Sequence, residues 1–305
     1  MDGLILVHKP EGPTSHDIVV RLRRTLGIRR IGHFGTLDPF ASGLLLAGVG
    51  KATRLFPFFS ASDKTYRGRI RLGIATDTYD RTGTVLSRMS PSSWPPVEDV
   101  RRAIDGLTGE ILQSPPPFSA KKILGRPSYA YARRRLEVEP QPCRVKVHAF
   151  LLKNYNPPDV DFEVACSAGT YIRSMARDLG TALGCGAHLA DLVRTAVGPY
   201  RLEEALSLET LAGLAEEGRG GEALIPLDRL LPHLPRVVLS SEDLLRVKNG
   251  RPLAALPGSL VLLEAGRPPS NEPPAVRLIG PEGNLVALAR FGPGESSLFP
   301  FLVLL

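Results

Sequence analysis

The pattern of apolar and polar residues predicts short β-strands interspersed with helices. Apolar runs of strand length cover residues 4–7 and 44–50. Apolar and polar residues alternate over residues 66–72 and 159–166, which is typical of strands that are buried on one face. In the first of these alternating segments Tyr66 falls on the apolar face. We therefore expect these segments to form strands, with the Tyr66 ring directed inward.

Apolar residues at helical spacing mark further segments. The first begins after Thr14 or Ser15, either of which can cap a helix, and ends at Gly27. Another ends near Gly109, and a third begins at Ile172. The apolar faces consist of Ile18, Leu22 and Leu26 in the first, Val100, Ile104 and Leu107 in the second, and Ile172, Met175 and Leu179 in the third.

The chain changes character near Pro235. Prolines punctuate residues 226–235, and beyond them short β-like runs are separated by Gly and Pro turns. These runs cover residues 236–239, 260–263, 276–279, 285–289 and 299–304. We therefore predict one domain over residues 1–234 and a second over residues 235–305.

Composition is that of a folded protein. With 305 residues and 43% hydrophobic content, the chain can bury a substantial core. No apolar run reaches the roughly 20 residues of a membrane helix, and no signal-peptide pattern is visible. We therefore expect a cytoplasmic protein that does not bind membranes. Three cysteines without a Cys-x-x-Cys spacing argue against a disulfide framework and a zinc site.

The net charge of +7 suggests a polyanionic partner, and the distribution of charge supports that inference. Residues 18–37 contain arginines but no acidic residue, and residues 121–135 are likewise basic without an acid. Solvated helix faces usually mix both signs, so phosphate contact explains the one-sided excess better. We expect both stretches to contact RNA.

A bent loop precedes the apolar run at residues 44–50. Its sequence is GHFGTLDPFASG, residues 32–43, where glycines and Pro39 impose a bend that presents Asp38 at a defined point. The alternative is that Asp38 only caps a turn through a side-chain hydrogen bond. The apolar run directly after the loop predicts rigid support, which favours a functional site.

The sequence contains no pattern that calls for a metal or a nucleotide cofactor. Residues 48–53 lack the first Gly and the hydroxyl residue of a phosphate-binding loop. Asp77 and Asp80 are three residues apart, without further oxygen ligands at regular spacing. His188 and Asp191 also lack a neighbouring ligand, so we expect them at the surface or at a cap. Our expectation is that the protein uses neither a metal nor a cofactor.

Several motifs, in order along the chain, resemble those of the TruB family of tRNA pseudouridine synthases. Residues 32–43 meet every fixed position of the pattern Gly-His-x-Gly-x-Leu-Asp-Pro-x-Ala-x-Gly. The resemblance covers roughly residues 4–200. The other motifs are Asp-Lys-x-Tyr at 63–66, Thr-Asp-Thr-x-Asp-x-x-Gly at 76–83, Ser-Ala-x-Lys at 119–122, Tyr-x-Tyr-Ala-Arg at 129–133 and Gly-Thr-Tyr-Ile-Arg at 169–173.

The resemblance implies a role for each of these positions. Asp38 would be the nucleophile and Arg173 its ion-pair partner, while Tyr66 would stack on the target base and help to remove a proton. His33 would lie against the RNA where the base is turned out, and Tyr171 would line the pocket. The further substrate-binding residues that we assign are Lys9, Lys64, Asp77, Lys122, Tyr129 and Arg194.

The same resemblance implies an α+β fold with a mixed, largely antiparallel sheet and helices around it. It adds an RNA-gripping insertion near residues 118–140 and a small C-terminal PUA-like β-barrel that binds RNA. The implied activity is tRNA processing: a monomer without a cofactor turns out the T-loop uridine, position 55, and isomerises it to pseudouridine. Attack of Asp38 on C1′ and a glycal-type elimination both remain open as routes.

Two other classes of function compete with this interpretation. An RNA-binding or tRNA-folding module without chemistry would tolerate changes at Asp38 or Arg173, yet both residues are present. A base-exchange transglycosylase usually needs a second carboxylate and a barrel of repeated βα units, and the sequence indicates neither. A pseudouridine synthase is therefore the interpretation that the motifs favour.

Overall fold

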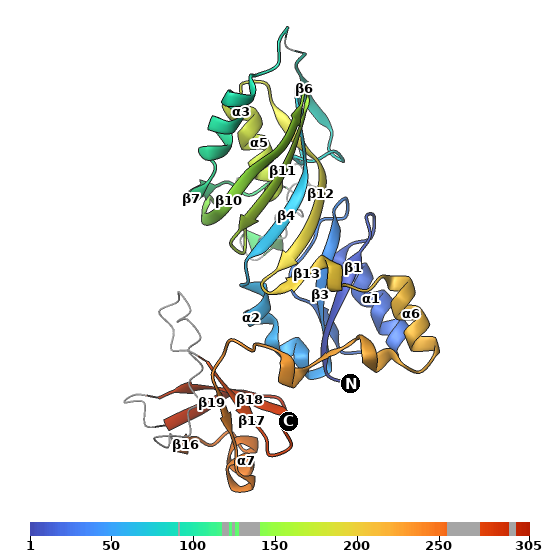
Figure 1. Cartoon of the computed structure of the whole chain (residues 1–305), viewed down its shortest axis with the longest axis vertical. Helices are drawn as coiled ribbons and strands as arrows, with labels where there is room; N and C mark the ends of the chain where they lie inside the picture. The colour runs from blue at the N-terminus through green and yellow to red at the C-terminus, as the bar shows by residue number, and fades with distance from the viewer. Residues whose placement is uncertain (91, 118–121, 124–125, 128–140, 255–274, 293–296) are drawn as a thin grey trace.

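The computed structural model describes residues 1–90, 92–117, 122–123, 126–127, 141–254, 275–292 and 297–305. A large mixed sheet with helices beside it forms the upper part of the molecule in Figure 1, and a smaller sheet lies at the lower end. The N-terminus lies near the junction of the two sheets, and the C-terminus lies on the smaller one (Figure 1). The α+β class predicted from the sequence is therefore confirmed.

The large sheet has ten strands in the order β14-β1-β3-β12-β4-β11-β10-β7, with β2 beside β3 and β13 beside β12. Within the part of the chain that the structure describes, β12 and β3 are its one parallel pair. The strands are β1 Gly3–Lys9, β2 Ile31–His33, β3 Ser42–Val49, β4 Lys64–Leu72, β7 Gly109–Gln113, β10 Cys143–Asn156, β11 Asp159–Cys166, β12 Ala187–Val197, β13 Tyr200–Arg201 and β14 Ile225–Pro226.

Strands β4 and β11 follow the alternation that the sequence predicts. The outer face of β4 carries arginines that pair with carboxylates of β11, as when Arg71 Nη2 lies 2.8 Å from Asp159 Oδ2. The inner face packs into a core shared with α3 Val97–Asp105 and α5 Ile172–Ala182. Its buried members on β4 are Tyr66, Ile70 and Leu72.

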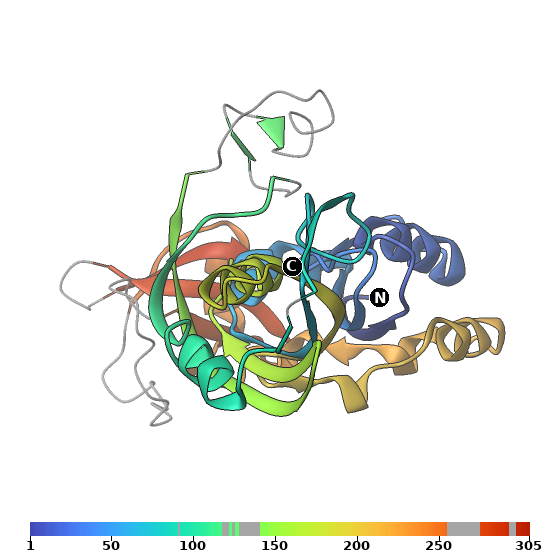
Figure 2. The same ribbon diagram turned by 90° about the horizontal axis from the view of Figure 1, so that it is seen from above.

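Helix α1, Ser15–Leu26, begins and ends where its sequence predicts. Thr14 and Asp17 form a reciprocal capping box at its start, and Gly27 adopts a left-handed conformation at its end. Seen from above, α1 lies side by side with α6 Leu208–Glu216 (Figure 2). The other described helices are α2 Phe56–Ser60 and α7 Ser241–Lys248, with 3₁₀ turns η1 Gly50–Leu55, η2 Leu202–Glu204, η3 Gly220–Ala223 and η4 Leu227–Arg229.

Two short hairpins complete the upper part. One is formed by β5 Ile74–Thr76 and β6 Val85–Arg88, and the other by β8 Lys122–Ile123 and β9 Arg126–Pro127. The second hairpin belongs to the predicted insertion at residues 118–140, most of which lies outside the described residues. Among the described helices, none is long and apolar enough to cross a membrane.

The smaller sheet contains the strands predicted after residue 235. Its order is β15-β17-β18-β19-β16, and the predicted strand at residues 260–263 lies outside the described residues. Closure of this sheet into a barrel stays a prediction. The bounds are β15 Arg236–Val238, β16 Leu253–Ala254, β17 Val276–Ile279, β18 Leu285–Phe291 and β19 Ser297–Val303.

One hydrophobic core is common to the two sheets. It joins residues of β1 and β3 to residues of β18 and β19. At the surface of this junction the ring of Phe58 on α2 stacks on Phe301 of β19, with 6.3 Å between centroids. Arg54 also donates a hydrogen bond to the carbonyl oxygen of Val303. The smaller sheet is therefore fixed to the N-terminal part of the chain.

His188 is a correction to the sequence-based expectation. It does not lie at the surface but in strand β12, where it is 6% exposed. Its Nδ1 is 3.0 Å from the carbonyl oxygen of Ile74 on the neighbouring hairpin. The imidazole therefore joins two elements of the core, because a buried ring nitrogen needs a polar partner.

Candidate active site

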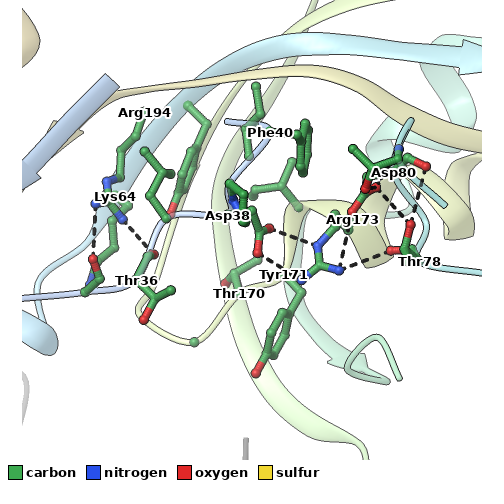
Figure 3. Close-up of a pocket in the computed structure, with 18 of the residues that line it drawn as sticks. Thr36, Asp38, Phe40, Lys64, Thr78, Asp80, Thr170, Tyr171, Arg173 and Arg194 are labelled. Atoms are coloured by element: carbon green, nitrogen blue, oxygen red, sulfur yellow. Dashed lines mark hydrogen bonds and ion pairs between the residues drawn. The ribbon is translucent and has the colours of Figure 1, made fainter. Parts of the chain in front are cut away.

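A pocket of about 720 Å³ opens beside the Asp38 loop, which connects β2 to β3 (Figure 3). Its walls come from this loop, the end of α2, the start of β4, residues 78–82, residues 167–173 and strand β12. These segments are far apart in the sequence, and the ten-stranded sheet brings them together. The volume falls within the range of about 300–1,000 Å³ typical of small-ligand pockets.

Asp38 and Arg173 form a two-point ion pair in this pocket (Figure 3). Asp38 Oδ2 lies 2.9 Å from Arg173 Nε, and Oδ1 lies 3.1 Å from Nη2. The Asp38 side chain is 32% exposed, whereas that of Arg173 is 7% exposed. The guanidinium therefore approaches from within the protein and leaves one side of the carboxylate open to the pocket.

A second carboxylate, Asp80, stands behind Arg173. Its Oδ2 lies 3.5 Å from Arg173 Nη1, and its side chain is only 5% exposed. The hydroxyl groups of Thr78 and Thr82 donate hydrogen bonds of 2.8 and 2.6 Å to Oδ1, and the Thr82 amide adds a third at 2.9 Å. Oδ1 of Asp80 is therefore held by three donors, and its Oδ2 faces Arg173 from the side opposite Asp38.

Buried polar groups hold the Asp38 loop from several sides. Lys9, on β1, donates to the carbonyl oxygens of Pro39 at 3.4 Å and Ala41 at 2.7 Å. The Ser15 hydroxyl accepts a hydrogen bond of 2.9 Å from the Leu37 amide. Burial lowers the pKa of Lys9 to about 8, an effect that the negative charge of Asp38 opposes. The loop is thus fixed immediately before and after Asp38.

Tyr66 lines the pocket from β4, close to a concentration of cations. Burial raises the pKa of Tyr66, while the charge of Arg194 and a hydrogen bond from it oppose that rise. Lys64 lies beside the pocket too and donates to the carbonyl oxygens of Ser60 at 2.7 Å and Ser62 at 2.6 Å. Burial lowers the pKa of Lys64 to about 8.

The remaining predicted residues differ in their placement. Tyr171 lines the pocket directly before α5, where Gln113 accepts a 2.7 Å bond from its amide and donates one of 3.0 Å to its carbonyl oxygen. His33 ends β2 and is partly buried, and burial together with the charge of Arg194 lowers its pKa. Arg194 is buried in β12 at the pocket's edge. Of these three residues, Tyr171 and Arg194 line the pocket and His33 does not.

Two of the predicted residues whose side chains the structure describes, Lys9 and Asp77, do not line the pocket. Lys9 is completely buried beneath the loop, so it supports the site rather than facing it. Asp77 closes a turn by accepting a 2.8 Å bond from the Thr84 amide. Lys122 lies in β8, and Tyr129 lies outside the described residues.

Sequence reasoning missed Asp80 and Gln113 as parts of the site. Asp80 belongs to a motif in which Asp77 was assigned instead, and the structure places Asp80 against Arg173. The signal available was the pair of threonines on either side of Asp80, because hydroxyls flanking a carboxylate can satisfy it in a buried position. Gln113 has no local signal, since its partner Tyr171 is remote in sequence.

The arrangement suits chemistry at a carbon that develops positive charge. An aimed carboxylate can attack such a carbon or stabilise it, and the adjacent guanidinium balances the charge of the free carboxylate. Asp38 is the more accessible of the two carboxylates, because Asp80 is only 5% exposed and its Oδ1 already accepts three hydrogen bonds. Among the described residues no group of three or more His, Cys, Asp or Glu side chains could hold a metal ion.

Solved structures share this fold. The chain resembles a protein of an H/ACA RNP bound to a substrate RNA containing 2′-deoxyuridine, with a TM-score of 0.72 and 26% sequence identity over 99% of this chain and 85% of that one. A chain of a Cbf5-Nop10-Gar1 complex gives a TM-score of 0.74 at 26% identity, again over 99% of this chain and 85% of the other.

The sequence matches two family models. The TruB family pseudouridylate synthase N-terminal domain covers residues 23–172, and the tRNA pseudouridylate synthase B C-terminal domain covers residues 173–246. Fold and site together thus define a pseudouridylate synthase, an isomerase. The chain belongs to the TruB family within that class.

Curated relatives support the family over most of the chain. The tRNA pseudouridine synthase B of Solibacter usitatus is 42% identical over 257 residues, which are 84% of this chain and 87% of that protein. The Geobacter sulfurreducens enzyme of the same name is 43% identical over 254 residues, 83% of each chain. That of Geobacillus thermodenitrificans is 39% identical over 294 residues, 94% of each chain.

Proposed function

We propose that this protein isomerises uridine 55 in the T-loop of tRNA to pseudouridine. The observation that carries the proposal is the two-point ion pair between Asp38 and Arg173, open to the pocket on one side. Relatives named tRNA pseudouridine synthase B, similar over most of the chain, support tRNA as the substrate. The basic composition suits a polyanionic partner.

In the reaction the N1–C1′ bond of uridine breaks, the base rotates, and C5 becomes bonded to C1′. Asp38 either attacks C1′ or stabilises its positive charge while the base is detached, and Arg173 keeps the carboxylate aimed. In the alternative glycal route Tyr66 removes a proton from C2′ while the N1–C1′ bond breaks and its electron pair leaves with the base, and C2′ regains a proton when C5 bonds to C1′. The C5 proton leaves at the end of either route. The reaction is redox-neutral, so the chemistry requires no nicotinamide or ATP.

The uridine has to leave its stack to reach Asp38. Turning a base out of a folded loop costs roughly a few kcal/mol, which contacts to phosphates and to the base offset. Tyr66 and Tyr171 provide ring surfaces at the pocket, and His33 at the end of β2 occupies the place of the turned-out base in the stack. A pocket that encloses the uridine also excludes water from C1′.

The remaining assignments follow from the same proposal. Residues 1–234 form the catalytic domain and residues 235–305 an RNA-binding, PUA-like domain. Lys122 and Tyr129 of the insertion at residues 118–140 contact the tRNA, and Lys64 adds positive charge beside the pocket. The protein works as a cytoplasmic monomer without a cofactor.

Tritium release tests the proposal. An unmodified tRNA transcript labelled with tritium at uridine C5 is incubated with the protein and no added cofactor. We expect release of about one label per tRNA, none with the Asp38→Asn variant, and none from a transcript in which cytidine replaces the uridine at position 55. Binding of tRNA without release by the wild type would contradict the proposal and favour the RNA-binding module.

A further inference from the structure

Arg194 lies at the centre of a hydrogen-bond arrangement that spans the Asp38 loop. It is 1% exposed and occupies strand β12. Its Nε donates to the Leu44 carbonyl oxygen at 2.7 Å, while Nη1 and Nη2 donate to those of Thr36 at 3.1 Å and Gly35 at 3.3 Å. Thr36 and Leu44 stand on opposite sides of Asp38 in the sequence. One guanidinium therefore joins the two ends of the loop.

The backbone of Arg194 adds a second connection. It pairs with Gly43 of β3 in the parallel register and with Tyr66 of β4 in the antiparallel register. The approach to β3 is so close that a Cβ atom at Gly43 would lie 2.4 Å from the Arg194 carbonyl oxygen. Arg194 thus contacts the loop that carries Asp38 and the strand that carries Tyr66.

A phosphate contact does not fit this environment. The guanidinium donates to the backbone carbonyl oxygens of Leu44 and Thr36, and the side chain is 1% exposed. A planar, five-donor group is suited to bridging several fixed acceptors, which a lysine cannot do with one nitrogen. The sequence-based assignment of Arg194 as an RNA contact is therefore replaced.

We propose that Arg194 is a positioning residue that fixes the Asp38 carboxylate relative to the Tyr66 ring, and that it does not bind the tRNA. This inference rests on the proposed function, because it concerns the geometry in which a uridine meets both side chains. Small displacements of reacting groups lower rates by large factors, so loss of the bridge affects the chemical step and leaves RNA affinity intact.

The test compares Arg194→Lys and Arg194→Met with the wild type. Arg67 of β4 is exposed and pairs with Val193, so Arg67→Lys is the matched control. Single-turnover rates at saturating tRNA and tRNA affinities at several salt concentrations are measured. We expect both Arg194 variants to lose about 10- to 100-fold in rate. Affinity should stay within about twofold, with an unchanged dependence on salt.

The possible results separate the hypotheses. A phosphate contact would weaken binding and reduce the salt slope by about one unit, which would overturn the inference. Wild-type rates in Arg194→Lys would overturn it as well. If Arg194→Met fails to fold, as judged by circular dichroism, Arg194→Lys decides the question because it preserves the charge and most of the volume. Failure of the wild type to release tritium would instead contradict the proposed function itself.

Discussion

At the scale of single residues, Arg173 is shared between two carboxylates of different character. Both line the pocket, but the Asp38 side chain is 32% exposed and that of Asp80 only 5%. Threonine donors satisfy Oδ1 of Asp80, while its Oδ2 contacts Arg173 at a different nitrogen from Asp38. The direction in which the Asp38 carboxylate points thus depends on Asp80 through the orientation of Arg173.

We expect Asp80→Asn to slow the single-turnover reaction by about 10- to 100-fold with little change in tRNA affinity, because an amide holds Arg173 less tightly. Asp77→Asn is the matched control, since Asp77 lies in the same segment but only accepts a hydrogen bond from the Thr84 amide. Tritium release and filter binding measure the two quantities. Equal rates in the two variants would contradict the role of Asp80.

Lys9 gives stability a defined dependence on pH. The pKa of Lys9 is about 8 in the folded protein, whereas the ordinary pKa of a lysine is 10.5. At pH values between these two pKa values, the unfolded chain therefore binds more protons than the folded protein. The free energy of unfolding of the wild type should therefore rise with pH in this window, relative to that of Lys9→Met. Urea unfolding of both proteins measures the difference.

The comparison with Lys9→Met isolates this one group. Lys64 also has a pKa lowered to about 8, and burial raises the pKa of Cys166 to about 11, but both groups titrate in wild type and variant alike. A difference in unfolding free energy that stays constant across the window would show that Lys9 is not the titrating group.

At the scale of elements, the Asp38 loop lies between β1 and β12. Lys9 of β1 and Arg194 of β12 donate hydrogen bonds to it from either side. Close packing of β3 against β12 is a condition of this arrangement. Gly43 permits this close packing. Its φ of +113° disfavours residues other than glycine, and the nearby Arg194 backbone leaves no room for a Cβ atom.

Gly43→Ala should therefore destabilise the protein more than a glycine replacement that strains the backbone alone. Gly12 is the matched control, because its φ is +110° and nothing lies within 4 Å of a Cβ added there. We expect about 1–3 kcal/mol for Gly12→Ala from strain and about 1–3 kcal/mol more for Gly43→Ala from crowding. Urea unfolding provides both values, and equal losses would contradict the crowding argument.

Sequence patterns identified helix α1 but missed two of the strands of the large sheet. Helix α1 was predictable because its cap, apolar face and terminal Gly27 agree. Strands β10 and β12 were not assigned, and both contain register shifts, for example between Leu189 and Asp191, that break the period of two. Arg194 also makes β12 look like a polar, exposed segment in the sequence, although the residue is buried.

The site was predictable to a similar extent. Resemblance in two separate motifs, residues 32–43 and 169–173, led to Asp38 and Arg173, and the structure brings these side chains together. The buried positions of Lys9 and Arg194 were not predictable, because a cation that binds phosphate and one that binds backbone carbonyls look the same in a sequence. Their distinction depends on burial, which arises only when β1, β3 and β12 assemble.

At the scale of the whole molecule, the core shared by the two sheets couples their stability. Leu302 of β19 is 9% exposed in this core, although it belongs to the proposed C-terminal domain. The single tryptophan, Trp94, packs against the separate core that contains α3 and α5, so its fluorescence reports on the folding of that core. A substitution at Leu302 that is followed by Trp94 fluorescence therefore tests whether the two cores unfold together.

Leu302→Ala should shift the unfolding midpoint reported by Trp94 fluorescence and by circular dichroism to the same extent, with a loss of about 2–5 kcal/mol. Leu245→Ala in α7 is the matched control, because Leu245 is 62% exposed and its loss should cost within about 0.5 kcal/mol. A shift seen by circular dichroism alone would show that the C-terminal sheet unfolds independently.

Helix α2 contacts both the pocket and the smaller sheet, since Ser60 lines the pocket and Phe58 stacks on Phe301. The distance between the pocket that contains Asp38 and the C-terminal sheet is therefore fixed by the fold. An RNA that touches both surfaces must present two regions at that same separation. Recognition by this distance depends on the shape of the folded RNA and not on its base sequence. RNAs of different sequence but the same shape would therefore meet this requirement equally well.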